Sequence, residues 1–271
     1  MHVVFQGMPT QAQSLKPYIG IHGGVNFTQP QIMETYTIVT LISGEELQGK
    51  QYDPIFRNFG HQIGITFALE INDHFSVGLM PQIAAYSYGY SSLIDFFTND
   101  GSQASTAENI SEYELNYINF PVYIQYIIRE AAFSPYLTAG FSCGYLRNVQ
   151  HQVVTNTTIY AEEENLVFSQ LNSNNYSTGF IHSKMNLFGG IGVFYEFTLF
   201  RLAVDFTYWY GLNNIVNETR RFENQTISGS TYDISDDIKL HHLVMNFSIL
   251  FPINKPTNRG SLDCVLPQKR R

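Results

Sequence analysis

Residues 57–128 contain three consecutive segments in which apolar residues alternate with small or polar ones, joined alternately by a very short turn and a long polar loop. Between positions 60 and 71, the odd positions from Ile63 to Ile71 are apolar, whereas the even positions from Gln62 to Glu70 are small or polar. Successive side chains of a β-strand point to opposite faces. One face of such a segment therefore suits lipid and the other suits a narrow interior, which predicts a membrane β-barrel.

The composition is typical of a chain that crosses a membrane with strands. Charged residues make up 14% of the 271 positions, well below the roughly 25% of soluble proteins. No run of about eighteen apolar residues occurs, so no helix is expected to span a bilayer, and only a closed barrel could do so. The mean hydropathy of -0.11 agrees with this, because half of each barrel strand is hidden from lipid. The net charge of -8 argues against nucleic acid as a partner.

Eight segments carry the alternation, an even number as barrel closure requires. Connections two, four and six are short, whereas the others run to about twenty to thirty residues, well beyond an ordinary hairpin loop. We therefore expect an all-β fold: an eight-stranded antiparallel up-and-down transmembrane β-barrel with short periplasmic turns, long extracellular loops and both chain ends in the periplasm. Ten strands are possible if 95–112 or 160–176 hides a hairpin. The expected strands are 18–27, 57–71, 74–90, 112–128, 135–149, 182–197, 200–212 and 239–252.

The two ends of the chain fall outside the expected barrel, which we place at 15–252. Segment 1–14 has an apolar patch before small residues but no basic start. It is interpreted either as the remnant of an export signal or as the remnant of a protease-cleavage tag. Segment 253–271 is rich in lysine and arginine, and we expect an unstructured periplasmic tail, with a docking peptide as the alternative.

Eight strands enclose a space just wide enough to be filled by side chains or to hold one small ligand, so an open channel is not expected. The inward positions support a filled interior, since bulky residues share them with glycines that leave room for rings from across the barrel. The bulky residues are Met80, Gln82, Tyr86, Tyr117, Tyr123, Gln125, Tyr136, Phe188, Phe194 and Trp209, and the glycines are Gly20, Gly24, Gly64, Gly78, Gly140, Gly144, Gly190 and Gly192.

Three charged residues share the inward parity and are expected to meet near the periplasmic end. Glu196 and Arg201 flank the expected turn at 198–199, and Glu70 should lie at a similar depth. A buried charge persists only when it is paired. We therefore interpret Glu70, Glu196 and Arg201 as a structural cluster, with a proton or ion relay as the functional alternative.

No catalytic, cofactor-binding or metal-binding residues are expected. A lipid-modifying enzyme would need His and Ser side by side, but His182 and Ser183 are adjacent in a strand and therefore point to opposite faces. His241 and His242 diverge for the same reason and have no third ligand at metal-like spacing. Pro121 lies inside an expected strand, where it lacks a ladder donor. It indicates a bulge or a locally opened pairing, which we interpret as a tolerated bulge or, alternatively, as a lateral site.

Three stretches of strand and turn sequence point to a known family. Tyr18 to Phe27 reads YIGIHGGVNF, Asn119 to Val122 reads NFPV, and Ser134 to Gly140 reads SPYLTAG. They resemble the PorT-like outer-membrane β-barrel family of Bacteroidetes over almost the whole barrel. The resemblance implies an integral outer-membrane protein, and the family's namesake is tied to type IX secretion and gliding. It supplies no catalytic residue, and the tail after Pro252 departs from barrels that end on their last aromatic residue.

These observations predict a non-enzymatic outer-membrane protein, an accessory subunit of a secretion or cell-envelope complex of the type IX kind. The expected partners are outer-membrane lipid and lipopolysaccharide, together with other envelope or secretion proteins. The first alternative is a stand-alone small barrel that binds or passes a small apolar ligand. The second is a lipid-modifying outer-membrane enzyme.

Overall fold

The computed structural model describes the barrel region and neither end of the chain. The expected leader at 1–14, and all but the first residue of the expected tail at 253–271, lie outside the described residues. The described residues are 15–36, 39–40, 45–47, 49–98, 101–128, 132–160, 165–175, 177–223, 231–232 and 234–253.

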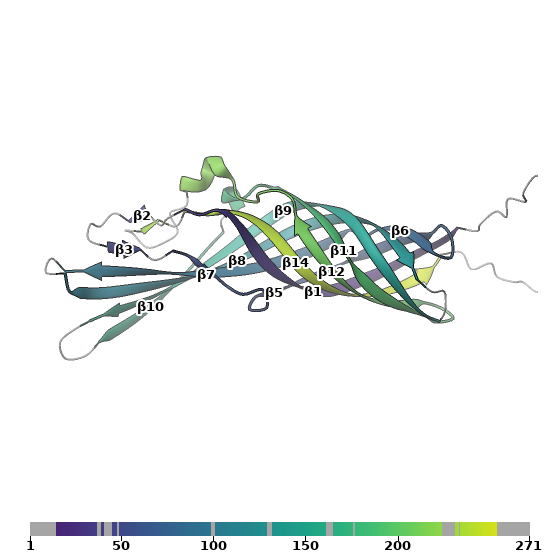
Figure 1. Cartoon of the computed structure of the whole chain (residues 1–271), viewed down its shortest axis with the longest axis horizontal. Coiled ribbons are helices and arrows are strands. Elements are labelled where there is room, and N and C mark those ends of the chain that lie inside the picture. Colours follow the sequence, from purple (N-terminus) through teal and green to yellow (C-terminus); the bar gives the residue numbers. More distant parts are fainter. Residues whose placement is uncertain are drawn as a thin grey trace, which may run out of the picture.

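Eight strands, each antiparallel to its neighbours, form a closed barrel wall, in which β6 and β7 together make up one strand (Figure 1). β14 pairs with β12 on one side and with β1 on the other, so the ring has no free edge. The predicted all-β, eight-stranded architecture is therefore confirmed. The wall consists of β1 (Lys16–Glu34), β5 (Phe59–Glu70), β6 (Phe75–Leu79) continued by β7 (Gln82–Phe97), β8 (Gln103–Ile127), β9 (Phe133–Ile159), β11 (Ser183–Glu196), β12 (Arg201–Gly211) and β14 (Asp237–Pro252).

The register shows how strongly the strands are staggered. Following paired residues round the ring from Lys184 leads back to the same strand at Phe194, ten residues further along. A stagger of this kind tilts the strands, and eight of them then enclose a lumen that side chains can fill.

The predicted alternation of faces is confirmed. Gln62 is buried, whereas its neighbour Ile63 is 66% exposed. Outward apolar side chains form a belt round the wall, which we call the apolar belt. On β8 the outward positions from Tyr126 to Phe120 are apolar, and those from Asn116 to Glu112 are polar. The belt therefore ends well before the strand does.

We call the two ends of the barrel the turn end and the loop end. The turn end holds the start of β1, the end of β14 and the short β5–β6 and β11–β12 turns, where Ile71 N–H donates to Phe75 O and Phe197 N–H donates to Phe200 O. The loop end holds the long connections. Part of the third expected turn, 129–131, lies outside the described residues.

The wall continues beyond the barrel at the loop end (Figure 1). β7, β8 and β9 extend past the apolar belt, and β10 (Leu166–Asn175) pairs with β9. Two of the long connections, 95–112 and 160–176, are thus largely strand, because ladder pairing carries on where the ring opens. β10 pairs only with β9 within the described part of the chain, so the ten-stranded alternative is wrong.

The short elements are β2 (Val39–Thr40), β3 (Glu45–Leu47), β4 (Gln51–Tyr52), β13 (Thr231–Tyr232), η1 (Ser177–Gly179) and η2 (Glu218–Glu223).

At Pro121 the structure shows the locally opened pairing that was one of the expected alternatives, and no bulge. The β8–β9 ladder runs unbroken through Pro121, and its register shifts between Asn116 and Tyr117 instead. The break is in the facing strand, between β6 and β7. Met80 N–H donates to Pro121 O at 2.9 Å, but proline has no N–H to return the bond. The expected opening of the pairing is therefore found between β6 and β7, whereas no bulge forms, because the register is the same on both sides of the break. The break also contains Pro81, which has no N–H either.

Three of the eight predicted inward glycines make room for rings from the neighbouring strand, and not from across the barrel as expected. Each ring belongs to the residue directly opposite the glycine in register. The ring lies over the backbone of the next strand and fills the space that the glycine leaves. The pairs, with the distance from an added glycine Cβ to the ring, are Gly78–Tyr123 (2.3 Å), Gly192–Tyr136 (2.3 Å) and Gly140–Phe188 (2.4 Å).

Among the residues that the structure describes, no helix has the length and apolar character needed to cross a membrane.

Candidate functional site

The structure brings Glu70, Glu196 and Arg201 together inside the turn end. Arg201 Nη2 lies 2.6 Å from Glu70 Oε1, and Arg201 Nε lies 2.6 Å from Glu196 Oε2. Arg201 also donates to the Tyr18 hydroxyl at 3.1 Å, and that hydroxyl donates to Glu70 at 3.3 Å. The β11–β12 turn sets Glu196 opposite Arg201 in register, whereas Glu70 comes from a distant part of the wall. Barrel closure therefore gives one guanidinium two carboxylate partners.

A small cavity of about 170 Å³ lies beside this cluster. Lys16 lines it and is 4.0 Å from Glu70, with its own side chain half exposed. On the inner side, the guanidinium carbon of Arg201 lies 3.9 Å from the centre of the Phe194 ring. Because both carboxylates form ion pairs with Arg201, the arrangement suits a structural cross-link between strands at the turn end better than a proton or ion relay.

Hydrogen-bonded and stacked side chains fill the middle of the lumen. His22 Nδ1 lies 2.8 Å from Thr66 Oγ1, and His22 Nε2 lies 2.9 Å from Gln82 Oε1. The rings of Phe188 and Trp209 stack 4.5 Å apart. All five side chains are buried, so the predicted filling of the interior is confirmed here.

Lys184 is a buried lysine that sequence reasoning did not single out. It is 1% exposed and places Nζ 2.6 Å from His242 Nε2. The same Nζ lies 3.4 Å from the ring centre of Tyr86 and 5.0 Å from that of Tyr117. Parity is the signal that could have found it, since Lys184 shares the even, inward positions of Phe188 on β11.

Apolar side chains from two loops cap the lumen at the loop end. Phe180 and Val216 form an isolated β-bridge, and both are buried with Ile215 against the aromatic core of the barrel mouth. Ile181 N–H donates to Ile215 O at 2.7 Å, which joins the two loops. Packed side chains therefore close this end.

Asp236 ties the first loop to the last over the cap, and its neighbour Asp237 braces the last loop. Asp236 accepts a hydrogen bond from Tyr36 N–H at 2.7 Å and lies 3.3 Å from Lys50 Nζ. Asp237 forms an ion pair with Arg221 of η2. All four charged side chains of these pairs are at most 9% exposed. The cap is thus held by polar ties as well as by apolar burial.

His151 lies in an aromatic stack beyond the apolar belt. On β9 the outward positions after Tyr145 are Arg147 and Gln150, which are polar and exposed. The His151 ring stacks on Tyr113 at 3.9 Å, is fully buried, and has no hydrogen-bond partner at either nitrogen. Burial lowers the pKa of His151 to about 4.

This lowered pKa predicts a loss of stability in acid. Between about pH 6.5, the unfolded value, and about pH 4, the unfolded chain binds a proton at His151 that the folded chain does not. The free energy of unfolding should therefore fall with decreasing pH, by about 3 kcal/mol over the window. Urea midpoints measured in detergent at neutral and acidic pH should show this slope, and His151→Phe should reduce it. An unchanged slope in His151→Phe would contradict the assignment.

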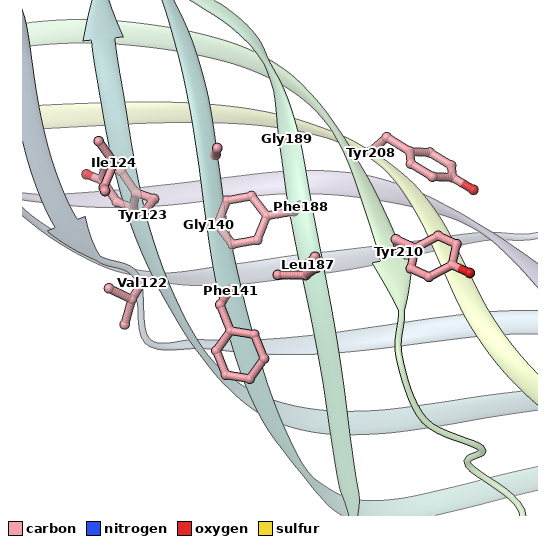
Figure 2. A pocket seen from close by; sticks show the side chains of 11 residues that line it. Val122, Tyr123, Ile124, Gly140, Phe141, Leu187, Phe188, Gly189, Tyr208 and Tyr210 are labelled. Atoms are coloured by element: carbon pink, nitrogen blue, oxygen red, sulfur yellow. The ribbon is translucent and has the colours of Figure 1, made fainter.

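An apolar groove of about 900 Å³ lies on the outer wall within the apolar belt (Figure 2). Its floor is low because two small residues, Ala139 of β9 and Gly189 of β11, face each other in register there. In Figure 2, β8 side chains stand on one side of this floor and the tyrosines of β12 on the other. We call it the wall groove. It is lined by Val122, Tyr123, Ile124, Ala139, Gly140, Phe141, Leu187, Phe188, Gly189, Tyr208 and Tyr210.

The candidate histidines lie in separate environments. Ser183 is exposed, and the adjacent His182 ring lies 5.7 Å from Tyr145. His241 lies 4.6 Å from the Tyr210 ring on the outer wall, whereas His242 is inside, so the two histidines diverge as predicted. No group of three or more His, Cys, Asp or Glu in the described ranges is arranged to hold a metal ion.

Comparisons with known proteins agree with the barrel. A family profile described as "Outer membrane protein beta-barrel domain" matches residues 11–217. No curated protein sequence matches the chain.

Three solved structures show loose similarity. OprG from Pseudomonas aeruginosa is 16% identical with a TM-score of 0.37, covering 89% of this chain and 98% of that chain. Ail of Yersinia pestis, in complex with the heparin analogue sucrose octasulfate, is 12% identical with a TM-score of 0.31, covering 87% and 99%. Neisserial surface protein A is 9% identical with a TM-score of 0.32, covering 88% and 99%. Similarity at this level transfers no ligand to this chain.

Proposed function

Because the chain belongs to the outer membrane protein beta-barrel domain family, we propose that it is a non-enzymatic subunit of an envelope complex whose outward surfaces carry the function. One contrast supports this proposal. The lumen is packed and capped, whereas the wall carries a groove of about 900 Å³. A secretion complex of the type IX kind is the first assembly to test, because of the PorT-like resemblance.

The proposed orientation places the turn end in the periplasm with both chain ends. The short turns and the projecting sheet at opposite ends support it, since barrels of this class carry short periplasmic turns and longer extracellular loops. The sheet of β7 to β10 would then stand outside the cell. Outer-membrane lipid and lipopolysaccharide would contact the apolar belt.

The wall groove is the proposed contact for an envelope protein. Large apolar side chains cover most of the belt, whereas Ala139 and Gly189 leave the wall backbone accessible. A partner's apolar surface can approach such a floor closely and gain packing contacts that lipid chains fill less well. Tyr208 and Tyr210 supply hydroxyls at one side, which suit a partner that reaches the polar interface.

Site-specific photo-crosslinking in native membranes tests this proposal. A photoreactive residue at Leu187, in the groove, should yield a discrete protein adduct, whereas the same residue at Ile65, exposed to a similar degree on β5, should not. Gly189→Leu should fill the groove and remove the adduct. It should leave folding intact, because the nearest atom to an added Cβ is 3.6 Å away. Equal lipid-only adducts at both positions would contradict the proposal.

The alternative is a stand-alone barrel that holds a small apolar ligand in the same groove. In that case Leu187 would crosslink a small molecule and the protein would be isolated as a lone monomer. A lipid-modifying enzyme would instead change the masses of lipid A or phospholipids on overexpression, and we expect those masses to stay unchanged.

A further inference from the structure

Lys184 lies inside the barrel without an acidic partner. Its side chain is 1% exposed, and no carboxylate of the described residues lies within ion-pair distance of Nζ. By contrast, Arg201 at the turn end has two carboxylates at 2.6 Å. The aromatic face of Tyr86, 3.4 Å from Nζ, favours the charged ammonium. A buried charge is costly unless it is balanced, so a protonated Lys184 needs a counter-charge that the described residues do not provide.

The hydrogen bonds behind Lys184 determine where its positive charge resides. Asn26 Nδ2 donates to Ala85 O at 3.1 Å, which leaves Asn26 Oδ1 to accept from the Thr28 hydroxyl. Thr28 Oγ1 must then accept from His242 Nδ1, 3.0 Å away. His242 Nε2 is therefore an acceptor, and Lys184 donates to it. When the pair holds an extra proton, its positive charge therefore resides on Lys184.

Polar groups beside Lys184 are buried and have no partner. Asn186 and Ser142 are direct register partners on β11 and β9, with Cβ atoms expected about 5 Å apart. Neither bonds to the other, although both are fully buried. Asn119 reaches the same region, because its side chain lies over Gly144, the register partner of Lys184. The unpartnered atoms are Tyr117 Oη, Asn119 Oδ1, Ser142 Oγ, and both Asn186 Nδ2 and Oδ1.

We propose that a small monovalent anion of chloride size binds inside the barrel, between the Lys184 ammonium and the donors of Asn186 and Ser142. The ammonium, amide and hydroxyl donors all suit a halide. Water alone would satisfy the unpartnered atoms but would leave the charge of Lys184 unbalanced. The remaining carbonyl oxygens, on Asn119 and Asn186, are acceptors and take water beside the anion. This site is independent of the wall groove and of any partner bound there.

Bromide substitution tests the site directly. Crystals of the full chain grown in sodium bromide should show an anomalous peak within hydrogen-bond distance of Lys184 Nζ. Lys184→Met should abolish the peak, and Lys16→Met, which removes an exposed lysine from the same barrel, should keep it. A wild-type structure with only water at this position, or a peak that persists in Lys184→Met, would overturn the proposal.

A solution measurement covers the case in which Lys184→Met does not crystallise. Above the dissociation constant, each tenfold rise in chloride should lower the apparent unfolding constant of the wild type about tenfold, at ionic strength held constant with gluconate. Asn186→Leu should weaken this dependence, and Lys16→Met should retain it. Identical stability of the wild type in chloride and in gluconate would refute the anion site.

Discussion

Replacing Arg201 with leucine should lower the free energy of unfolding by about 3–5 kcal/mol, because it leaves two carboxylates at the turn end without their shared cation. Losing the partner should cost more free energy at Glu70 than at Glu196, because the Glu70 side chain is 8% accessible to solvent whereas that of Glu196 is 35% accessible. The measurement is the urea midpoint of the folded barrel in detergent micelles, followed by the fluorescence of Trp209. That residue is the only tryptophan and lies inside the lumen.

Two variants separate pairing from loss of volume. Lys16→Ala removes a cation that is 4.0 Å from Glu70 but half exposed, so its effect should stay within about 1 kcal/mol. Glu70→Leu combined with Arg201→Leu removes the strongest pair together. It should be less destabilised than Arg201→Leu alone, because no unpaired carboxylate remains on β5. If Arg201→Leu were as stable as the wild type, the cluster would not be a structural tie.

Replacing Gly190 with alanine should destabilise the barrel by about 3 kcal/mol or more, at the upper end of overpacking effects. An added Cβ would lie 2.0 Å from the backbone oxygen of Phe206 and 2.7 Å from Thr207 Cα. Both atoms belong to the backbone of β12, so no side-chain rotation can relieve the contact. The narrow barrel must then shift a strand, which weakens its ladder. Urea midpoints and heat-dependent gel mobility both measure this loss.

The adjacent glycine provides the matched control. Gly189 has the same chemistry but points outward, and the nearest atom to its added Cβ is Thr138 O at 3.6 Å. Gly189→Ala should therefore change the free energy of unfolding by less than about 0.5 kcal/mol, as expected away from packed features. Equal destabilisation by Gly189→Ala and Gly190→Ala would mean that inward crowding does not explain the effect.

Much of the wall could be predicted because strand geometry is local. The alternation in 60–71 assigned Gln62 to the lumen and Ile63 to the outside, and the structure agrees. The opposite directions of His241 and His242 follow from the same period of two. The proximity of Glu196 and Arg201 also follows locally, because they flank a tight turn between paired strands.

Contacts that depend on register could not be predicted in this way. The sequence pattern suggested rings crossing the lumen, but Tyr136 lies over Gly192 on the neighbouring strand. It suggested a bulge or an opened pairing at Pro121, and only the register shows that the pairing opens toward the facing strand, at Met80 and Pro81. Both outcomes depend on which residues stand opposite each other, and a local pattern does not encode that pairing.

The order of residues by itself determined the all-β architecture, the number of wall strands and the face of the wall residues wherever the alternation is unbroken, since alternation acts within each strand. Only the tertiary structure decided what the lumen contains. Closing the ring with a stagger of ten residues brings Lys184 of β11 against His242 of β14 and Tyr86 of β7, and it leaves the wall groove over Ala139 and Gly189. These side chains are far apart in the chain, and their contact depends on the register of every strand between them.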